Sequence, residues 1–162
     1  MSSARVRLTF LAVLLLLPSC TGPRAPGPDV VNDPFPEAQA ELRAVVESVA
    51  RDAMTANVNG LQSIHLQSPK FTKFGPRSFH RQDVAATNQE EAAHFTSISQ
   101  LRYEIEDLKI DVFGDVAVVT YYPQVFFVKD GEQRAGSGRQ TFVFLKTADG
   151  WKIVHEHGTP RF

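Results

Sequence analysis

The chain has a single cysteine among its 162 residues. One thiol cannot form a disulfide bond within the chain, so a disulfide framework is excluded and the fold must depend on a hydrophobic core. The chain also lacks an uninterrupted apolar stretch of the roughly 20 residues that a membrane-spanning helix needs. Its 17 basic and 18 acidic residues nearly cancel, which excludes the strongly basic surface typical of nucleic-acid-binding proteins. The remaining composition, 43% hydrophobic and 22% charged, is that of one ordinary globular domain.

The first 20 residues have the pattern of an export signal. Arg5 and Arg7 give a positive start, an apolar-rich stretch covers residues 8–17, and Leu17-Pro18-Ser19-Cys20 follows. This ending resembles a bacterial lipobox, in which Cys20 becomes the lipidated first residue of the mature protein. The alternative is a plain cleaved signal with an incidental cysteine, but no small-x-small cleavage site is as well placed.

Residues 21–36 are predicted to tether the domain to the lipid. They contain five prolines and two glycines, a composition that favours extended backbone and cannot form a core. Thr21 follows Cys20, so the aspartate that retains many such lipoproteins in the inner membrane is absent. We therefore expect a lipid-anchored protein of the cell envelope, in the outer membrane if the host has one. Loss of the leader removes two arginines and no acids, which gives the mature chain a formal charge of −3.

Three helices are predicted in the first half of the domain, which spans residues 37–162. Apolar residues from Leu42 to Ala53 recur at intervals of three and four, which predicts an amphipathic helix over residues 37–56. A short second helix is expected around residues 61–66. Thr87 with Glu90 has the form of a capping box and predicts the start of a third helix.

The second half of the domain alternates with the period of β-strands. A phase shift at Glu106-Asp107 predicts a bulge in the first long strand, and the turns are marked by Gly114, Asp130-Gly131 and Asp149-Gly150. A short strand is also expected within residues 70–74. The strands of the meander are predicted at residues 103–113, 116–128, 139–147 and from 150 onward.

The order of these elements predicts an α+β domain, with three helices covering one face of a curved antiparallel sheet that ends in a four-stranded meander. Residues 116–128 and 139–147 are apolar on both faces, which one helical layer does not explain. We therefore expect a partner subunit on the second face and a homodimer.

The closing strand carries the residues most suggestive of a site. Simple alternation places Trp151, Ile153, His155 and His157 on one face and Glu156 on the other, without deciding which face lines a pocket.

The two histidines of this strand are possible metal ligands. His155 and His157, roughly 6 to 7 Å apart at their Cα atoms, supply two ligands of the kind that metals bind. A third ligand would have to come from His94, His80 or Asp83, and nothing in the spacing requires it. We therefore predict a structural histidine pair, with no metal and no cofactor.

The tail Trp-x-x-x-His-x-His, after a helical half and a curved meander, resembles the nuclear transport factor 2-like cone. Within that superfamily the chain resembles the SnoaL-like domains, a group that includes ketosteroid isomerase-like proteins. Its segments Gly114–Thr120, Asp130-Gly131 and Asp149–His157 correspond to theirs. The tail, and Ser68–Phe74, are also similar to the association domain of calcium/calmodulin-dependent protein kinase II. The resemblance covers roughly residues 37 to 160 and implies the cone fold.

The resemblance does not imply a particular reaction, because the known site residues are not matched in this chain. In ketosteroid isomerase-like enzymes a base aspartate follows the first strand, where this chain has Lys73-Phe74-Gly75-Pro76, and the helix tyrosine position corresponds to Val49. The arginines with which the kinase association domain binds carboxylates correspond to Pro123, Phe142 and Gly158. In place of these charged groups, the strands of this chain carry many aromatic residues. Those predicted to line an apolar cavity are Tyr103, Tyr121, Tyr122, Phe126, Phe127, Phe142 and Phe144.

Two functions follow as expectations. The first is a membrane-tethered domain that binds a small apolar or aromatic molecule through Tyr103, Tyr121, Phe142, Phe144 and His157, or that serves as an envelope assembly module, without catalysis. The second is an isomerase, dehydratase or cyclase of the SnoaL-like kind.

In the enzyme alternative, general acid–base catalysis would use His155 or His157 with Glu156 or Asp83. Glu156 has a simpler interpretation as an exposed or ion-paired residue, with Arg139 as a possible partner, and Asp107 at the predicted bulge is a further candidate acid.

Overall fold

The computed structural model describes residue 27 and residues 29–160. The predicted signal peptide, Cys20 and residues 21–26 and 28 of the predicted tether lie outside these residues, so the lipid anchor stays a prediction. Among the residues described, no helix is both long and apolar enough to cross a bilayer.

Three helices form in the predicted order, and the first of them follows the predicted apolar spacing. Helix α1 spans Pro36–Met54 and buries Leu42, Val46, Ala50 and Ala53, which recur at three and four. Helix α2 spans Val58–Ile64, with Asn57 as its N-cap.

Helix α3 spans Val84–Thr96 and begins one turn earlier than predicted. Asp83 is its N-cap, and the Asp83 carboxylate accepts a hydrogen bond from the backbone N–H of Ala86. The prediction of a capping box at Thr87 is therefore wrong: Thr87 is fully buried inside the helix. An aspartate cap satisfies the free N–H groups before the chain reaches Thr87.

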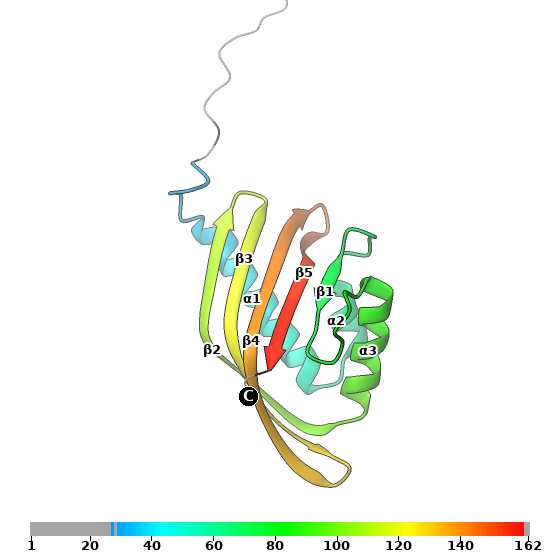
Figure 1. Ribbon diagram of the computed structural model, residues 1–162. Coiled ribbons are helices and arrows are strands. Elements are labelled where there is room, and N and C mark those ends of the chain that lie inside the picture. The colour runs from blue at the N-terminus through cyan, green and yellow to red at the C-terminus, as the bar shows by residue number, and fades with distance from the viewer. Residues whose placement is uncertain (1–26, 28, 161–162) are drawn as a thin grey trace, which may run out of the picture.

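Five strands form one mixed sheet, in the order β1-β5-β4-β3-β2 (Figure 1). The four C-terminal strands are antiparallel neighbours, which confirms the predicted meander. The short β1 pairs with β5 in parallel and closes one edge of the sheet. The bounds of the strands are β1 Thr72–Phe74, β2 Ser99–Phe113, β3 Val116–Lys129, β4 Glu132–Thr147 and β5 Gly150–Pro160.

Bulges curve the sheet and set which side chains point inward. The predicted bulge in β2 is confirmed, because the register with β3 shifts between Glu106 and Lys109 and Asp107 has φ 51°. A second bulge lies in β5: Val143 and Phe144 of β4 are opposite His155 and Ile153, which leaves Val154 without a partner. The inward-facing phase of β5 therefore changes between Ile153 and Glu156.

The helices lie on one side of the sheet, with α1 crossing behind the strands and α2 and α3 beside β1 (Figure 1). The α+β class is thus confirmed. Between the layers lies a core of fully buried residues, among them Leu42, Phe71, Val119 and Phe144. Beyond this core, the far end of the β3–β4 hairpin extends past the end of β5 (Figure 1).

The other face of the sheet carries apolar side chains that remain exposed. Phe113 is 45% exposed, Val116 40% and Tyr122 46%. The homodimer that would cover them stays a prediction, which the mass of the protein in solution can test.

Candidate functional site

A lysine is buried in the short edge strand. Lys73 is 3% exposed, and its Cα position in β1 is opposite that of Glu156 in β5. Strands in register present their paired side chains on the same face, so both groups point toward the helices. Their neighbours Phe74 and His157 are likewise paired and point away from the helices.

The ammonium group of Lys73 joins two carboxylates from distant parts of the chain. Its Nζ lies 2.6 Å from Oε1 of Glu91 and 3.0 Å from Oε1 of Glu156. Glu91 comes from α3 and is 7% exposed, and Glu156 is 9% exposed. Gln140 Nε2 also donates a hydrogen bond of 3.3 Å to Glu156 Oε1. Two carboxylates that would repel each other are thus held by one buried cation.

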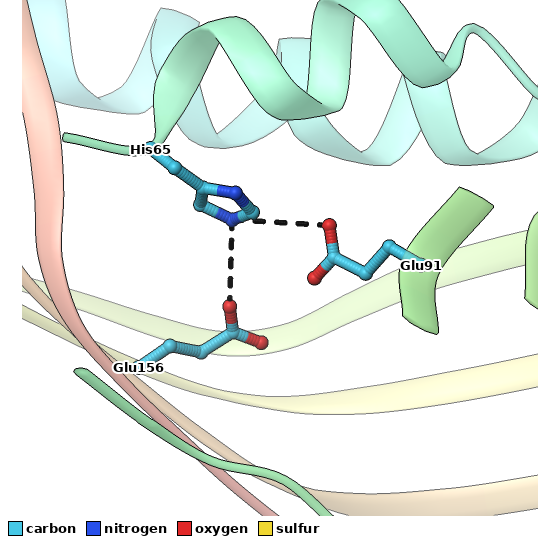
Figure 2. Close-up of side chains that lie close together, drawn as sticks. All are labelled: His65, Glu91 and Glu156. Carbon is cyan, nitrogen blue, oxygen red and sulfur yellow. Dashed lines mark ion pairs between the residues drawn. The ribbon is translucent and has the colours of Figure 1, made fainter. Parts of the chain in front are cut away.

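His65 completes the group, which we call the buried charge cluster: His65, Lys73, Glu91 and Glu156. His65 follows the last residue of α2, and its Nδ1 lies 2.9 Å from Oδ1 of Asn88 in α3. That contact directs Nε2 at the carboxylates, 3.8 Å from Glu91 Oε2 and 3.7 Å from Glu156 Oε2 (Figure 2). Both distances exceed a direct hydrogen bond, so the attraction is one of charge.

The cluster shifts the pKa values of His65, Lys73 and Glu156 in the direction that favours their charged forms. Burial raises the pKa of Glu156, but the charge of Lys73 and the contact with His65 outweigh it and bring that pKa down to about 2. Burial lowers the pKa of Lys73, yet the charges of Glu156 and Glu91 leave that pKa above its ordinary value. The pKa of His65 is raised for the same reason, because the two carboxylates outweigh its burial.

His65, Glu91 and Glu156 are also the residue types that bind a divalent cation, and their ligand atoms lie within 4.8 Å of one another. The Lys73 ammonium, however, already lies between the two carboxylates. A metal there would face a fixed positive charge at hydrogen-bond distance. The residues present fit an internal lysine cation better than a metal ion.

Next to the cluster lies a small space, here called the inner chamber, of about 70 Å³. Its walls include His65, Glu91, Phe142 and Glu156. Tyr103 and Tyr121 also line it, with their hydroxyl oxygens 3.0 Å apart.

Both tyrosine hydroxyls of the inner chamber keep their protons at neutral pH. Burial raises the pKa of Tyr103 to about 12 and that of Tyr121 well above its ordinary value. The pair is therefore a source of neutral hydrogen-bond donors and acceptors.

A second space, here called the middle chamber, lies on the open side of the cluster and has a volume of about 200 Å³. It shares Tyr103, Gln140 and Glu156 with the inner chamber, and its other walls include apolar side chains such as Ile98, Leu101 and Phe127. A groove of about 370 Å³, here called the vestibule, continues from it toward the β3–β4 hairpin and shares Val125, Phe127 and Gln140 with it. The three spaces share wall residues, so they lie side by side between the cluster and the β3–β4 hairpin.

The structure reverses the predicted facing of the last strand. The bulge at Val154 places Glu156 on the inner face with Trp151 and Ile153, while His155 and His157 point outward. His155 Nδ1 lies 2.8 Å from Thr72 Oγ1, and both histidine rings contact Phe74 edge-on. The prediction that the histidines share a face with Trp151 is therefore wrong. Of the candidate catalytic residues, Glu156 is the one that lines a chamber.

The remaining predicted residues divide between the chambers, the core and the surface. Tyr103, Tyr121 and Phe142 line the inner chamber, whereas Phe144 is 0% exposed and belongs to the core. Asp83 is occupied as the cap of α3.

Several other predicted site residues lie on the surface. Asp107 lies exposed at the bulge, and Tyr122 and Phe126 are on the outer surface. Arg139 is exposed and is not the partner of Glu156, because Lys73 and Gln140 fill that role.

Sequence reasoning missed three members of the buried charge cluster. Lys73 and Glu91 have side chains that are ordinarily exposed, and His65 is a lone histidine behind an apolar helix. The one available signal is the apolar Phe71 two residues before Lys73 in the segment predicted to be a strand, since residues two apart in a strand share a face. Phe71 and Lys73 are both buried.

Comparisons with known proteins agree with this architecture. The family model of the SnoaL-like domain matches residues 42–160. A search of curated proteins found no match. A nuclear transport factor 2-like superfamily protein from Salmonella enterica superposes with a TM-score of 0.72 at 18% identity, covering 78% of this chain and 93% of the other.

Two further solved structures show the same fold. A candidate dehydratase of the nuclear transport factor 2-like family from Streptomyces avermitilis has a TM-score of 0.71 at 16% identity, covering 80% of this chain and 99% of the other. A candidate calcium/calmodulin-dependent protein kinase II association domain from Xanthomonas campestris has a TM-score of 0.65 at 17% identity, covering 75% and 86%. At these identities the likeness shows the fold and leaves the activity open.

Proposed function

The chain belongs to the SnoaL-like domain family, and from that premise we propose that its cone binds a small, largely apolar molecule in the middle chamber. The observation that carries the proposal is the composition of that chamber, in which apolar side chains such as Ile98, Leu101 and Phe127 are combined with polar groups. Ligand sites typically combine apolar walls with a few convergent polar atoms. Here Tyr103 and Gln140 supply those atoms.

The size of the chamber limits the ligand. An apolar cavity of about 150 Å³ is large enough for benzene. The middle chamber, at about 200 Å³, therefore suits a single ring or a short branched chain, and the inner chamber of about 70 Å³ adds room for a small substituent.

The electrostatics favour binding over proton transfer. An efficient general acid or base has a pKa near the working pH. Glu156, with a pKa of about 2, is a weak base, and Tyr103, with a pKa of about 12, is a weak acid. Both groups instead act as fixed hydrogen-bonding partners, which can orient a ligand without reacting with it.

Filling the middle chamber is expected to abolish binding. Val125 of β3 lines both the middle chamber and the vestibule, so Val125→Trp places an indole in the ligand's path. We expect single-ring compounds to raise the melting temperature of the purified wild-type protein and to leave Val125→Trp unchanged. Tyr122→Trp, on the exposed opposite face of the same strand, is the matched control and should bind like wild type. Binding to Val125→Trp with wild-type affinity would place the ligand elsewhere.

We further propose that the domain works at a membrane surface through Cys20. The sequence Leu17-Pro18-Ser19-Cys20 and the proline-rich tether support this proposal. Cys20→Ser is expected to release the protein from the membrane fraction into the soluble fraction, because a lipid chain is the anchor. Fractionation followed by immunodetection measures the release. A variant that stays with the membrane would show that some other feature anchors the protein.

A further inference from the structure

Two carboxylate oxygens of the buried charge cluster have hydrogen-bonding capacity left. Lys73 Nζ lies 2.6 Å from Glu91 Oε1 and 3.0 Å from Glu156 Oε1, so it occupies one oxygen of each carboxylate. The other oxygen of each, Oε2, faces His65 Nε2 from 3.8 Å and 3.7 Å, which is too far for a direct hydrogen bond (Figure 2). Within the part of the chain that the structure describes, neither Oε2 atom accepts a hydrogen bond.

The residues that line the chambers place these two oxygens beside the inner chamber. Glu91 and Glu156 line both chambers, whereas Lys73 lines only the middle chamber and His65 only the inner chamber. The Oε1 atoms, which contact Lys73, are therefore on the side of the middle chamber, and the Oε2 atoms, which face His65, are on the side of the inner chamber. A group in the inner chamber thus meets two carboxylate oxygens that can each accept a hydrogen bond.

The tyrosine pair can donate one proton to the same chamber. Tyr103 and Tyr121 both line it, and a single hydrogen bond of 3.0 Å joins their hydroxyl oxygens. Each phenol has one proton, and this bond uses one of the two. Neither hydroxyl has a further hydrogen-bond partner among residues 29–160, so the second proton is available to a group in the chamber.

Charge and size limit what that group can be. An anion would lose its hydration and meet the two carboxylates. A cation would be repelled by Lys73, whose ammonium is already at hydrogen-bond distance from both carboxylates. The smallest uncharged group that both donates and accepts a hydrogen bond is a hydroxyl. The inner chamber, at about 70 Å³, has room for it, because a water molecule takes up about 30 Å³ of the liquid.

From these contacts we infer that the ligand is a small uncharged alcohol or phenol, with its apolar body in the middle chamber and its hydroxyl group in the inner chamber. The hydroxyl donates its proton to Oε2 of Glu156 or Glu91, and its oxygen accepts the remaining proton of the tyrosine pair. The inference rests on the proposed function and adds the chemical class and the orientation of the ligand. A ketone or an ether can accept the tyrosine proton but has no proton to donate to a carboxylate, so it satisfies only half of the site.

The test compares ligands that share a ring and differ in the polar group. Benzyl alcohol, benzyl methyl ether, toluene and benzylammonium are titrated into the purified protein by isothermal calorimetry. For the wild type we expect benzyl alcohol to bind about tenfold more tightly than either the ether or toluene, the ratio expected for one hydrogen bond to a charged acceptor. Benzylammonium should bind less tightly than the alcohol, because Lys73 already supplies the positive charge between the carboxylates.

Removing both phenolic protons should weaken binding of the alcohol and spare that of toluene. Tyr103→Phe/Tyr121→Phe keeps the two rings but leaves no phenol to donate to the ligand, so the affinity for benzyl alcohol should fall about fivefold. An unchanged affinity for toluene would show that the variant keeps its fold and its chambers. Tyr122→Phe, which removes an exposed phenol next to Tyr121 in β3, is the matched control and should bind both compounds like wild type.

The outcomes separate the inference from the proposed function. If benzyl alcohol binds no more tightly than toluene and the ether, or if benzylammonium binds most tightly, the inference is overturned and the proposed function stands. Full retention of the affinity for the alcohol in Tyr103→Phe/Tyr121→Phe would overturn it as well. Should that variant fail to fold, the comparison of ligands on the wild type decides alone. If no compound binds and none stabilises the protein, both fail. A preference for the alcohol that is reduced in the double variant and kept in Tyr122→Phe supports both.

Discussion

Replacing Lys73 with methionine is expected to lower the free energy of unfolding by about 3–5 kcal/mol at neutral pH. Methionine keeps much of the length of the lysine stem but removes the charge that holds Glu91 and Glu156 together. Two buried carboxylates would then face each other without a cation between them, and the loss of one partner of a buried ion pair costs more than the pair itself contributes. Urea unfolding monitored by Trp151 fluorescence measures the change.

Two further variants identify the cause of the loss. Lys146→Met removes a lysine whose partner Glu41 is 51% exposed, and should cost less than about 1 kcal/mol. Adding Glu91→Gln and Glu156→Gln to Lys73→Met removes both uncompensated charges and should restore at least half of the loss. If Lys73→Met were no more destabilising than Lys146→Met, the cluster would not be a buried ion network.

The order of the four meander strands and the curvature of the sheet could be predicted because each depends on local patterns. The phase shift after Ile105 revealed the bulge in β2, since a polar pair interrupts two runs of alternating residues. The bulge in β5 left no such mark. Ile153 and Val154 are both apolar, so the extra residue Val154 does not disturb the hydrophobic pattern. It nevertheless places Glu156 on the inner face, where simple alternation would place His155 and His157.

The buried charge cluster depends on contacts between segments far apart in the chain. Lys73 and Glu156 are 83 residues apart and meet only because β1 pairs with β5 in parallel. A three-residue strand carries too little pattern to predict its partner or its register. Without that register, a lysine in a short segment is expected to be exposed. Tyr103 and Tyr121 were easier to predict as wall residues, because each lies in a long segment whose composition predicts a β-strand.

The same cluster is expected to restrict the pH range over which the protein is most stable. The pKa of Glu156 in the folded protein is about 2, below its ordinary value of 4.5. A lowered carboxyl pKa stabilises the fold above the ordinary value, and this contribution disappears as the pH falls toward 2. The expected loss over that interval is about 3 kcal/mol for this one group. His65 has a raised pKa, so its contribution is present below 6.5 and disappears as the pH rises through the folded value.

Stability is lost in acid through Glu156 and in alkali through His65. It should therefore be greatest between about pH 4.5 and 6.5, the ordinary pKa values of the carboxyl and imidazole groups. Urea midpoints measured from pH 2 to 9 give the profile. Glu156→Gln should flatten the acid side, whereas Glu104→Gln, which removes a carboxylate that is 46% exposed, should leave the profile unchanged. His65→Gln should flatten the alkaline side while retaining the loss in acid. An acid side equally steep in Glu156→Gln and wild type would assign the loss to other carboxylates and remove Glu156 from the account of stability.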